Sequence, residues 1–170
     1  MSGVLVAYYT KNEHCTKIAH EIATKLHGRV DRITDYNRYK GTLGGFIGVL
    51  DAYFEKTTRI KYEMNPEDYT AVVIVSPVWA GNLPPAVRSY TNENIGKMKN
   101  YGFILSDDKP VRKKTIKRFC QQMPEALAEF STLDQDIDQE IFQKYLEDFA
   151  DRIRIIIEKE DYYGKNNTRL

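Results

Sequence analysis

The sequence predicts a doubly wound α/β fold built on one five-stranded parallel sheet. Short apolar runs without polar alternation, at residues 4–9, 71–75 and 101–105, are typical of strands that are covered on both faces. Segments with apolar residues at steps of three and four lie between these runs and predict helices. Because crossovers between parallel strands are right-handed, this order of strands and helices covers both faces of one sheet.

The first part of the chain predicts two strand–helix units. Residues 4–9 form the first strand, and residues 16–26 form an amphipathic helix that ends at Gly28. Residues 29–33 alternate between polar and apolar side chains and predict a short second strand. Residues 43–55 predict the second helix despite their glycines, because they carry an apolar stripe at helical spacing formed by Phe46, Ile47, Leu50 and Phe54.

The middle of the chain predicts a strand, a helix and a further strand. Residues 71–75 are uniformly apolar and predict a fully buried strand. Residues 84–92 predict a helix with prolines in its first turn, where a missing N–H costs little. Residues 101–105 form another apolar run and predict the fourth strand.

The last part of the chain completes the alternation. Residues 110–121 predict a helix, and residues 126–133 predict the fifth strand. Residues 138–159 carry a long apolar face and predict the last helix. We expect one domain over residues 1–160, followed by a frayed polar tail at residues 161–170.

Composition narrows the classes of function. The 170 residues are 42% hydrophobic and 29% charged, which suits one globular domain with a core. A net charge of +1 gives no reason to expect nucleic acid or an anionic membrane as partner. Two cysteines fit a reducing compartment, and neither a signal-peptide pattern nor an 18-residue apolar run is present. We therefore expect a cytoplasmic protein without a membrane span.

The most informative stretch is residues 72–90, VVIVSPVWAGNLPPAVRSY. Its apolar run stops abruptly, a tight segment follows, and a helix opens at the prolines. The only tryptophan of the chain, Trp79, lies in the tight segment. The strand therefore delivers a rigid aromatic loop to the carboxyl edge of the sheet, where open α/β sheets bind ligands.

Three stretches of the chain resemble short-chain flavodoxins and flavodoxin-like proteins. They are residues 4–26, VLVAYYTKNEHCTKIAHEIATKL, residues 41–60, GTLGGFIGVLDAYFEKTTRI, and residues 76–90, SPVWAGNLPPAVRSY, of which the last is the most specific. The resemblance covers nearly the whole chain. It implies a flavodoxin-like sheet with strand order 2-1-3-4-5, non-covalent binding of FMN, and electron transfer.

The resemblance places the FMN site on three loops. The loop after the first strand would cradle the phosphate with its N–H groups and the helix N-terminus. The loop around Trp79 would stack on the ring, and the loop after the fourth strand would form the far wall. The candidate cofactor-binding residues are Thr10, Lys11, Asn12, Glu13, His14, Cys15, Pro77, Val78, Trp79, Ala80, Gly81, Asn82, Ser106 and Asp107.

The first loop departs from the family pattern, which reads roughly Ser/Thr-x-Thr-Gly-Asn-Thr. Glu13 stands in place of glycine, and Asn12 and Cys15 stand in place of threonines. A carboxylate about 4 Å from a phosphate charge costs about 1–4 kcal/mol at effective dielectrics of about 80 to 20. Glu13 directed to solvent, or Lys11 and a protonated His14 nearby, would offset this cost. Cys15 fits a small residue at a threonine position better than a reactive thiol.

Three hypotheses about function follow. The first is an FMN-binding electron carrier that serves an unidentified redox partner protein or a small acceptor. The second is an FMN-dependent NAD(P)H:quinone-type reductase, which shares every site residue. The third is a flavodoxin-fold interaction or regulatory module without flavin, which Glu13 favours. An electron carrier fits better than a stand-alone enzyme, and both a monomer and a homodimer are compatible with the sequence.

Overall fold

The computed structural model describes residues 3–36, 39–123 and 126–167. Its centre is a five-stranded parallel sheet with the order β2-β1-β3-β4-β5, as predicted. In the register of the sheet, Val6 on β1 pairs with Val30 on β2 and with Val73 on β3. The strands are β1 Val4–Tyr8, β2 Arg29–Arg32, β3 Ala71–Pro77, β4 Tyr101–Asp107 and β5 Ala128–Leu133.

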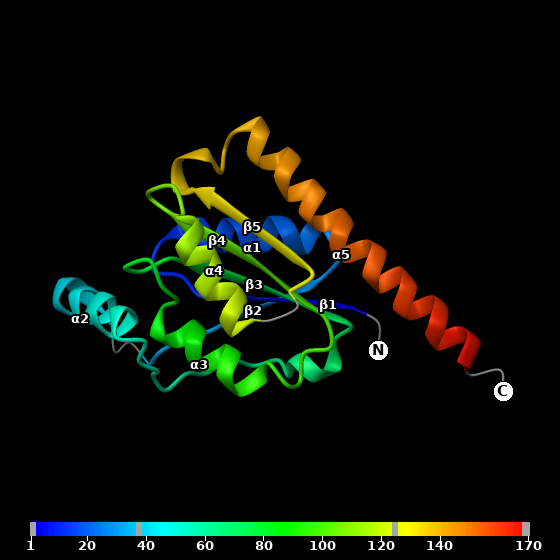
Figure 1. Cartoon of the computed structure of the whole chain (residues 1–170), viewed down its shortest axis with the longest axis horizontal. Helices are drawn as coiled ribbons and strands as arrows, with labels where there is room; N and C mark the ends of the chain where they lie inside the picture. Colours follow the sequence, from blue (N-terminus) through cyan, green and yellow to red (C-terminus); the bar gives the residue numbers. More distant parts are fainter. Residues whose placement is uncertain (1–2, 37–38, 124–125, 168–170) are drawn as a thin grey trace.

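Helices cover both faces of this sheet, which confirms the doubly wound α/β prediction (Figure 1). The helices are α1 Glu13–Lys25, α2 Gly41–Tyr53, α3 Pro85–Asn94, α4 Lys113–Gln122 and α5 Glu140–Asn167, with short 3₁₀ turns at η1 Pro66–Asp68 and η2 Asp134–Asp136. Within the described ranges, no helix combines the length and apolarity that crossing a membrane requires.

Alternate residues of the strands feed two apolar cores. Val73 of β3 faces the core beneath α1 and α5, where Ile18 and Leu146 are fully buried. Ile74, the next residue, faces the opposite core beneath α3 and α4 with Val87 and Phe119. Because successive strand residues point to opposite faces, a strand buried on both sides is apolar at every position.

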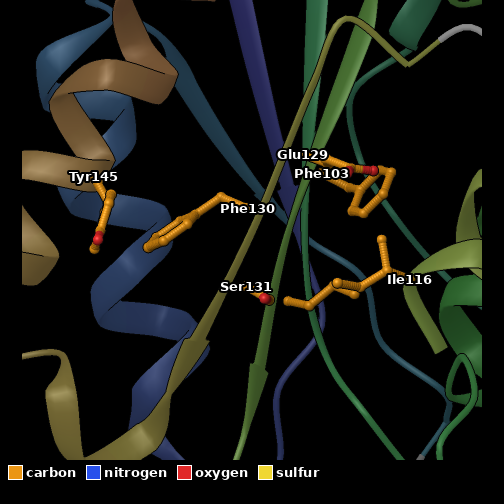
Figure 2. Close-up of a pocket in the computed structure, with 7 residues that line it drawn as sticks. Phe103, Ile116, Glu129, Phe130, Ser131 and Tyr145 are labelled. Carbon is orange, nitrogen blue, oxygen red and sulfur yellow. The ribbon is translucent and has the colours of Figure 1, made fainter. Parts of the chain in front are cut away.

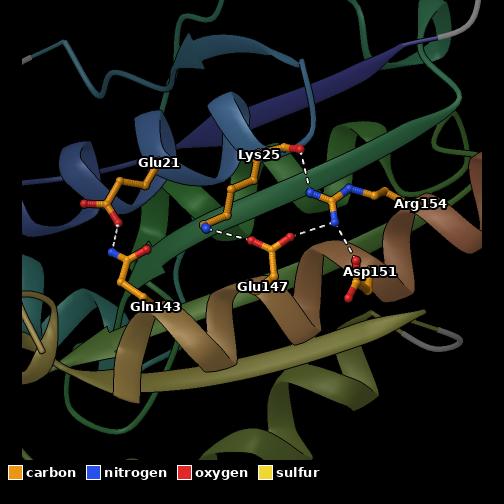
Figure 3. A network of polar contacts seen from close by, with 6 residues as sticks. All are labelled: Glu21, Lys25, Gln143, Glu147, Asp151 and Arg154. Atoms are coloured by element: carbon orange, nitrogen blue, oxygen red, sulfur yellow. Dashed lines mark hydrogen bonds and ion pairs between the residues drawn. The ribbon is translucent and has the colours of Figure 1, made fainter. Parts of the chain in front are cut away.

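A polar network fixes α5 along α1 (Figure 3). Glu147 accepts hydrogen bonds from Lys25 Nζ and Arg154 Nη1 at 2.7 and 2.8 Å, and these two partners lower the pKa of its carboxyl group. Arg154 also donates to the carbonyl oxygen of Lys25 at 2.8 Å, so a cation satisfies a carbonyl at the end of α1. Gln143 adds a hydrogen bond to Glu21 at 2.7 Å.

Several element ends differ from the sequence prediction. Helix α1 begins at Glu13, three residues early, because the side chain of Asn12 caps it. Helix α5 continues to Asn167, through most of the stretch predicted as a tail, while residues 168–170 lie outside the described residues. Strands β3 and β4 each run two residues further than predicted, to Pro77 and Asp107. These two residues were predicted in loops and instead end the strands.

Helix α2 departs most from the layered arrangement. It stands apart from the other helices, at the cyan end of the body in Figure 1. Gly44, Gly48, Asp51 and Ala52 form its buried face. The apolar stripe that predicted this helix is exposed to solvent. Periodicity therefore identified the helix correctly but did not indicate which face would be covered.

Candidate functional site

A cleft of about 970 Å³ opens at the carboxyl edge of the sheet, between the end of β1, the segment after β2, and α2. Its walls are aromatic on one side, where Tyr9, Tyr39 and Trp79 lie. Among the described residues, its charged lining is mostly cationic, with one carboxylate, Asp35, and the four cations Lys11, Arg32, Lys40 and Lys61. This combination suits a flat, partly apolar ligand that carries negative charge.

A tight turn fixes Trp79 in the wall of this cleft. Trp79 and Asn82 exchange two backbone hydrogen bonds of 3.0 and 2.9 Å, which close a two-residue turn. Ala80 and Gly81 at its centre have φ angles of 50° and 70°, as a type I′ turn requires. Glycine fits the second position without strain, while Ala80 adopts a conformation that few non-glycine residues use.

Neighbouring rings hold the indole in place. Trp79 lies edge-on to Tyr9 with centroids 5.6 Å apart, and edge-on to Tyr39 at 6.1 Å. A side chain at Gly48 would meet the indole, since a Cβ there would lie 2.8 Å from Trp79 Cζ3. The indole therefore contributes both to the apolar core and to the cleft wall.

A buried carboxylate organises the floor of the cleft. Tyr9 donates a hydrogen bond to Asp35 Oδ2 at 2.7 Å, and Lys11 Nζ lies 3.8 Å from the same oxygen. Lys11 also lies over the rings of Tyr39 and Trp79, at 5.6 and 6.0 Å from their centroids. Burial lowers the pKa of Lys11, while Asp35 acts in the opposite direction. Burial, then the hydrogen bond to Asp35, raises the pKa of Tyr9, so the phenol stays protonated.

Residues 10–15, predicted as a loop, include the N-cap Asn12 and the first residues of α1. The Asn12 side chain accepts a hydrogen bond from the N–H of His14 at 3.2 Å, which is an N-cap. Thr10 is buried and bonds to the Asn12 backbone oxygen. None of residues 10–16, all described, has a left-handed φ, so Glu13 causes no backbone strain in place of glycine. The Glu13 side chain is exposed, which reduces its repulsion of an anion at the loop.

Cys15, His14 and Ser106 lie on the other side of this loop and converge on Asp134. His14 Nδ1 lies 2.7 Å from one carboxylate oxygen of Asp134, and Ser106 donates to the other. Cys15 is buried, and burial followed by the nearby Asp134 raises its thiol pKa. A buried thiol that stays protonated is a poor nucleophile, so the structure supports the interpretation of Cys15 as a small packing residue.

Asn82 stabilises the loop after β3. Its side-chain oxygen accepts from Arg88 Nη2 at 2.8 Å and from the N–H of Leu83 at 3.0 Å. Its amide nitrogen donates to Glu55 Oε1 at 3.2 Å. This buried side chain therefore joins the Trp79 turn to α3 and to the end of α2.

The structure brings only part of the predicted site into the cleft. Thr10, Lys11 and Trp79 line it. The other predicted residues lie at the same sheet edge without lining it, and they are Asn12, Glu13, His14, Cys15, Pro77, Val78, Ala80, Gly81, Asn82, Ser106 and Asp107. Asp107, at the end of β4, has its pKa raised to about 6 by burial and by its hydrogen bond with Asp108.

The sequence analysis did not predict that residues after β2 form one wall of the cleft beside Trp79. Asp35, Tyr39 and Lys40 belong to it, and Gly41, Gly45 and Val49 extend it along α2. The signal that could have found it is the predicted strand order, because β2 borders β1 and their carboxyl ends share one edge. The sequence around Tyr36 and Tyr39 carries no motif that would place these tyrosines there.

A second hollow of about 280 Å³ lies at the far edge of the sheet, along β5 (Figure 2). Phe130 points toward Tyr145 on one side of the strand, and Phe103 and Ile116 lie on the other. Of the described residues that line it, one, Glu129, is charged. Because few polar groups converge there, this hollow suits a specific charged ligand less well than the cleft beside Trp79. Within the described residues, no group of His, Cys, Asp and Glu side chains could hold a metal ion.

Comparisons with solved structures place this fold among flavodoxins. A flavoprotein from Lactobacillus acidophilus NCFM in complex with FMN aligns with a TM-score of 0.67 at 14% identity, covering 82% of this chain and 98% of that chain. Flavodoxin 1 from Bacillus cereus gives 0.54 at 12% identity, and a Fusobacterium nucleatum flavodoxin bound to flavin mononucleotide gives 0.55 at 12%. Each of these two alignments covers 91% of this chain and 98% of the other. The chain therefore has a flavodoxin-like fold.

No protein-family model and no curated protein sequence matches the chain.

Proposed function

We propose that this protein binds FMN non-covalently in the cleft beside Trp79 and transfers electrons through it. The observation that carries the proposal is the aromatic and cationic lining of this cleft at the carboxyl edge of a flavodoxin-like sheet. Structures with the same fold that contain FMN or flavin mononucleotide support the choice of ligand.

The aromatic wall suits the flavin ring. An isoalloxazine needs an apolar slot with one flat, immobile surface. Trp79 supplies this surface, because the turn at Ala80 and Gly81 and the rings of Tyr9 and Tyr39 restrict the indole. The chain thus orients the ring without a large rearrangement of its own.

The N-terminus of α1 suits the phosphate group of FMN. A helix N-terminus presents free N–H groups and a partial positive charge to an anion. Lys11 directly precedes the Asn12 cap, and its Nζ, now held by Asp35 and the Tyr39 carbonyl oxygen, would turn to the phosphate. Glu13 points its side chain to solvent. The N–H of His14 is bonded to Asn12 Oδ1, so a phosphate would compete with the Asn12 side chain for that donor.

Bound FMN would supply reversible uptake and release of electrons. The protein would hold the ring against Trp79, neutralise the phosphate with Lys11, and keep the Asp35 carboxylate near the ring. A nearby carboxylate disfavours negative charge on the reduced ring and so lowers the reduction potential. A redox protein or a small acceptor would reach the cleft from its open side, and we place the protein in the cytoplasm.

The test is a fluorescence titration of FMN with the purified protein. We expect Trp79→Ala to weaken binding about 5- to 150-fold, because stacking on an aromatic side chain contributes about 1–3 kcal/mol. Tyr145→Ala is the matched control, since Tyr145 is exposed on α5 and lines the hollow at β5. Equal FMN affinity of the wild type and Trp79→Ala would contradict the proposed ring site.

One set of contacts favours a second candidate, a flavin-free interaction module. Asn12 already caps α1, and Asp134 places a carboxylate beside His14. An anion at this helix start would therefore meet an occupied donor and a like charge. Under this candidate, the wild type binds no FMN, and Glu13→Gly or Asp134→Asn creates measurable binding. Submicromolar binding of FMN by the wild type would exclude this alternative.

A further inference from the structure

Helix α2 and the residue after it expose a continuous run of large apolar side chains. Their exposed fractions range from 38% to 74%. We call them the α2 surface, formed by Leu43, Phe46, Ile47, Val49, Leu50, Tyr53 and Phe54. A helix that is apolar over so much of its circumference is normally buried.

The inner face of α2 cannot exchange places with this outer face. A Cβ at Gly44 would lie 2.6 Å from the backbone carbon of Tyr39, and one at Gly48 would lie 2.8 Å from the ring of Trp79. Leucine or phenylalanine therefore cannot take these positions if the helix rotates. Asp51 also keeps this inner face of α2 against the protein. Tyr39 donates a hydrogen bond to its carboxylate at 3.1 Å, and Lys56 Nζ lies 3.1 Å from the carboxylate.

The size of the α2 surface matches half of a stable interface. With about 200 Å² available to each large side chain, the exposed fractions correspond to about 800 Å². The largest apolar patch on a typical monomer is about 300–600 Å², and a standard interface takes about 800 Å² from each partner.

The chemistry of the surface fits a copy of itself. Residues 41–50 contain no charged side chain, although 29% of the whole chain is charged. The core of an interface is depleted in charge and enriched in aromatic residues, and Phe46, Tyr53 and Phe54 supply the latter. In a two-fold dimer the same patch occurs on both sides, so an uncharged apolar helix meets no unpaired charge.

A lipid surface fits less well. Helices that lie on membranes combine an apolar face with a polar face rich in lysine and arginine. The face of α2 opposite its apolar surface consists of Gly44, Gly48, Asp51 and Ala52, and it is buried against the protein. The basic polar face that would contact lipid headgroups is therefore missing from this helix.

We propose that the α2 surface is the interface of a two-fold homodimer. The contact borders the cleft, because Val49 belongs both to the α2 surface and to the cleft lining. A partner subunit would thus stand beside the mouth of the ligand site. The proposal does not depend on the identity of the ligand.

The test is sedimentation equilibrium of the full chain at several concentrations, with and without an altered α2 surface. We expect the wild type to have twice the 19.8 kDa of one chain. We expect Phe46→Glu and Leu43→Glu each to weaken the dimer at least about 30-fold, because a charge would replace a central apolar contact. Ile155→Glu on α5 replaces an equally apolar and exposed residue outside the surface, and it should leave the dimer unchanged.

Three outcomes would overturn the proposal. A wild type that remains monomeric at about 100 µM lacks the affinity that an interface of this size should give. A dimer that tolerates both Phe46→Glu and Leu43→Glu uses another surface. A monomeric wild type that floats with vesicles of phosphatidylcholine and phosphatidylglycerol, while Phe46→Glu does not, would assign the α2 surface to lipid.

Discussion

Two adjacent glycines of α2 give opposite predictions for the same substitution. A Cβ at Gly44 would lie 2.6 Å from the backbone carbon of Tyr39, whereas no described heavy atom outside the local helix lies within 4 Å of a Cβ at Gly45. Gly→Ala in a helix stabilises by about 0.5–1 kcal/mol, and overpacking costs about 1–3 kcal/mol. We expect Gly45→Ala to stabilise the protein by about 0.5–1 kcal/mol. We expect Gly44→Ala to be less stable than Gly45→Ala by about 1–3 kcal/mol.

Urea unfolding of the two variants measures this difference. Trp79 is the only tryptophan and packs against the same helix, so its fluorescence reports on α2, and circular dichroism reports on the whole fold. For a chain of 170 residues, 1 kcal/mol corresponds to about 2–4 °C in Tm. Both variants have the same helix propensity, so the contact alone separates them. Equal stabilities would refute the seating of α2 on Tyr39, and with it the outward orientation of its apolar residues.

Three further predictions concern the site. Lys11→Gln should weaken FMN binding about 3- to 30-fold while leaving riboflavin, which lacks the phosphate, nearly unaffected in a parallel titration; equal losses would place Lys11 away from the phosphate. Because the pKa of Asp107 is raised to about 6, the folded state binds the extra proton, and the contribution of Asp107 to stability should fall as pH rises from about 4 to 6. Asp107→Asn should remove this fall in urea unfolding, and an unchanged pH profile would contradict the assignment. Cys15 should resist iodoacetamide until denaturant is added, as peptide mass mapping would show, and labelling of the native protein would contradict its burial.

The sequence was sufficient for the fold because the three central strands, β1, β3 and β4, are apolar on both faces. Runs such as residues 71–75 can only be strands of a covered parallel sheet or segments of a buried helix, and their short length favours strands. The observed order β2-β1-β3-β4-β5 agrees with the order that the flavodoxin resemblance implied. The aromatic loop was also located correctly, and Trp79 does line a cleft at the carboxyl edge.

The sequence was insufficient for the arrangement around that loop. Helical periodicity indicates that an apolar stripe exists, but the close approach of Gly44 and Gly48 to Tyr39 and Trp79 determines which face of α2 is buried. These contacts join α2 to Tyr39, which precedes the helix, and to Trp79 in the turn after β3, so helical periodicity does not encode them. Similarly, Asp35 enters the site through a hydrogen bond from Tyr9, 26 positions away in the chain.

The proposed function requires that the cleft beside Trp79 binds FMN. The most direct measurement is the visible absorbance spectrum of the purified protein after incubation with excess FMN and removal of the unbound ligand. We expect a yellow protein with one FMN per chain and with quenched Trp79 fluorescence. A colourless protein whose tryptophan fluorescence does not respond to FMN would contradict the proposed function.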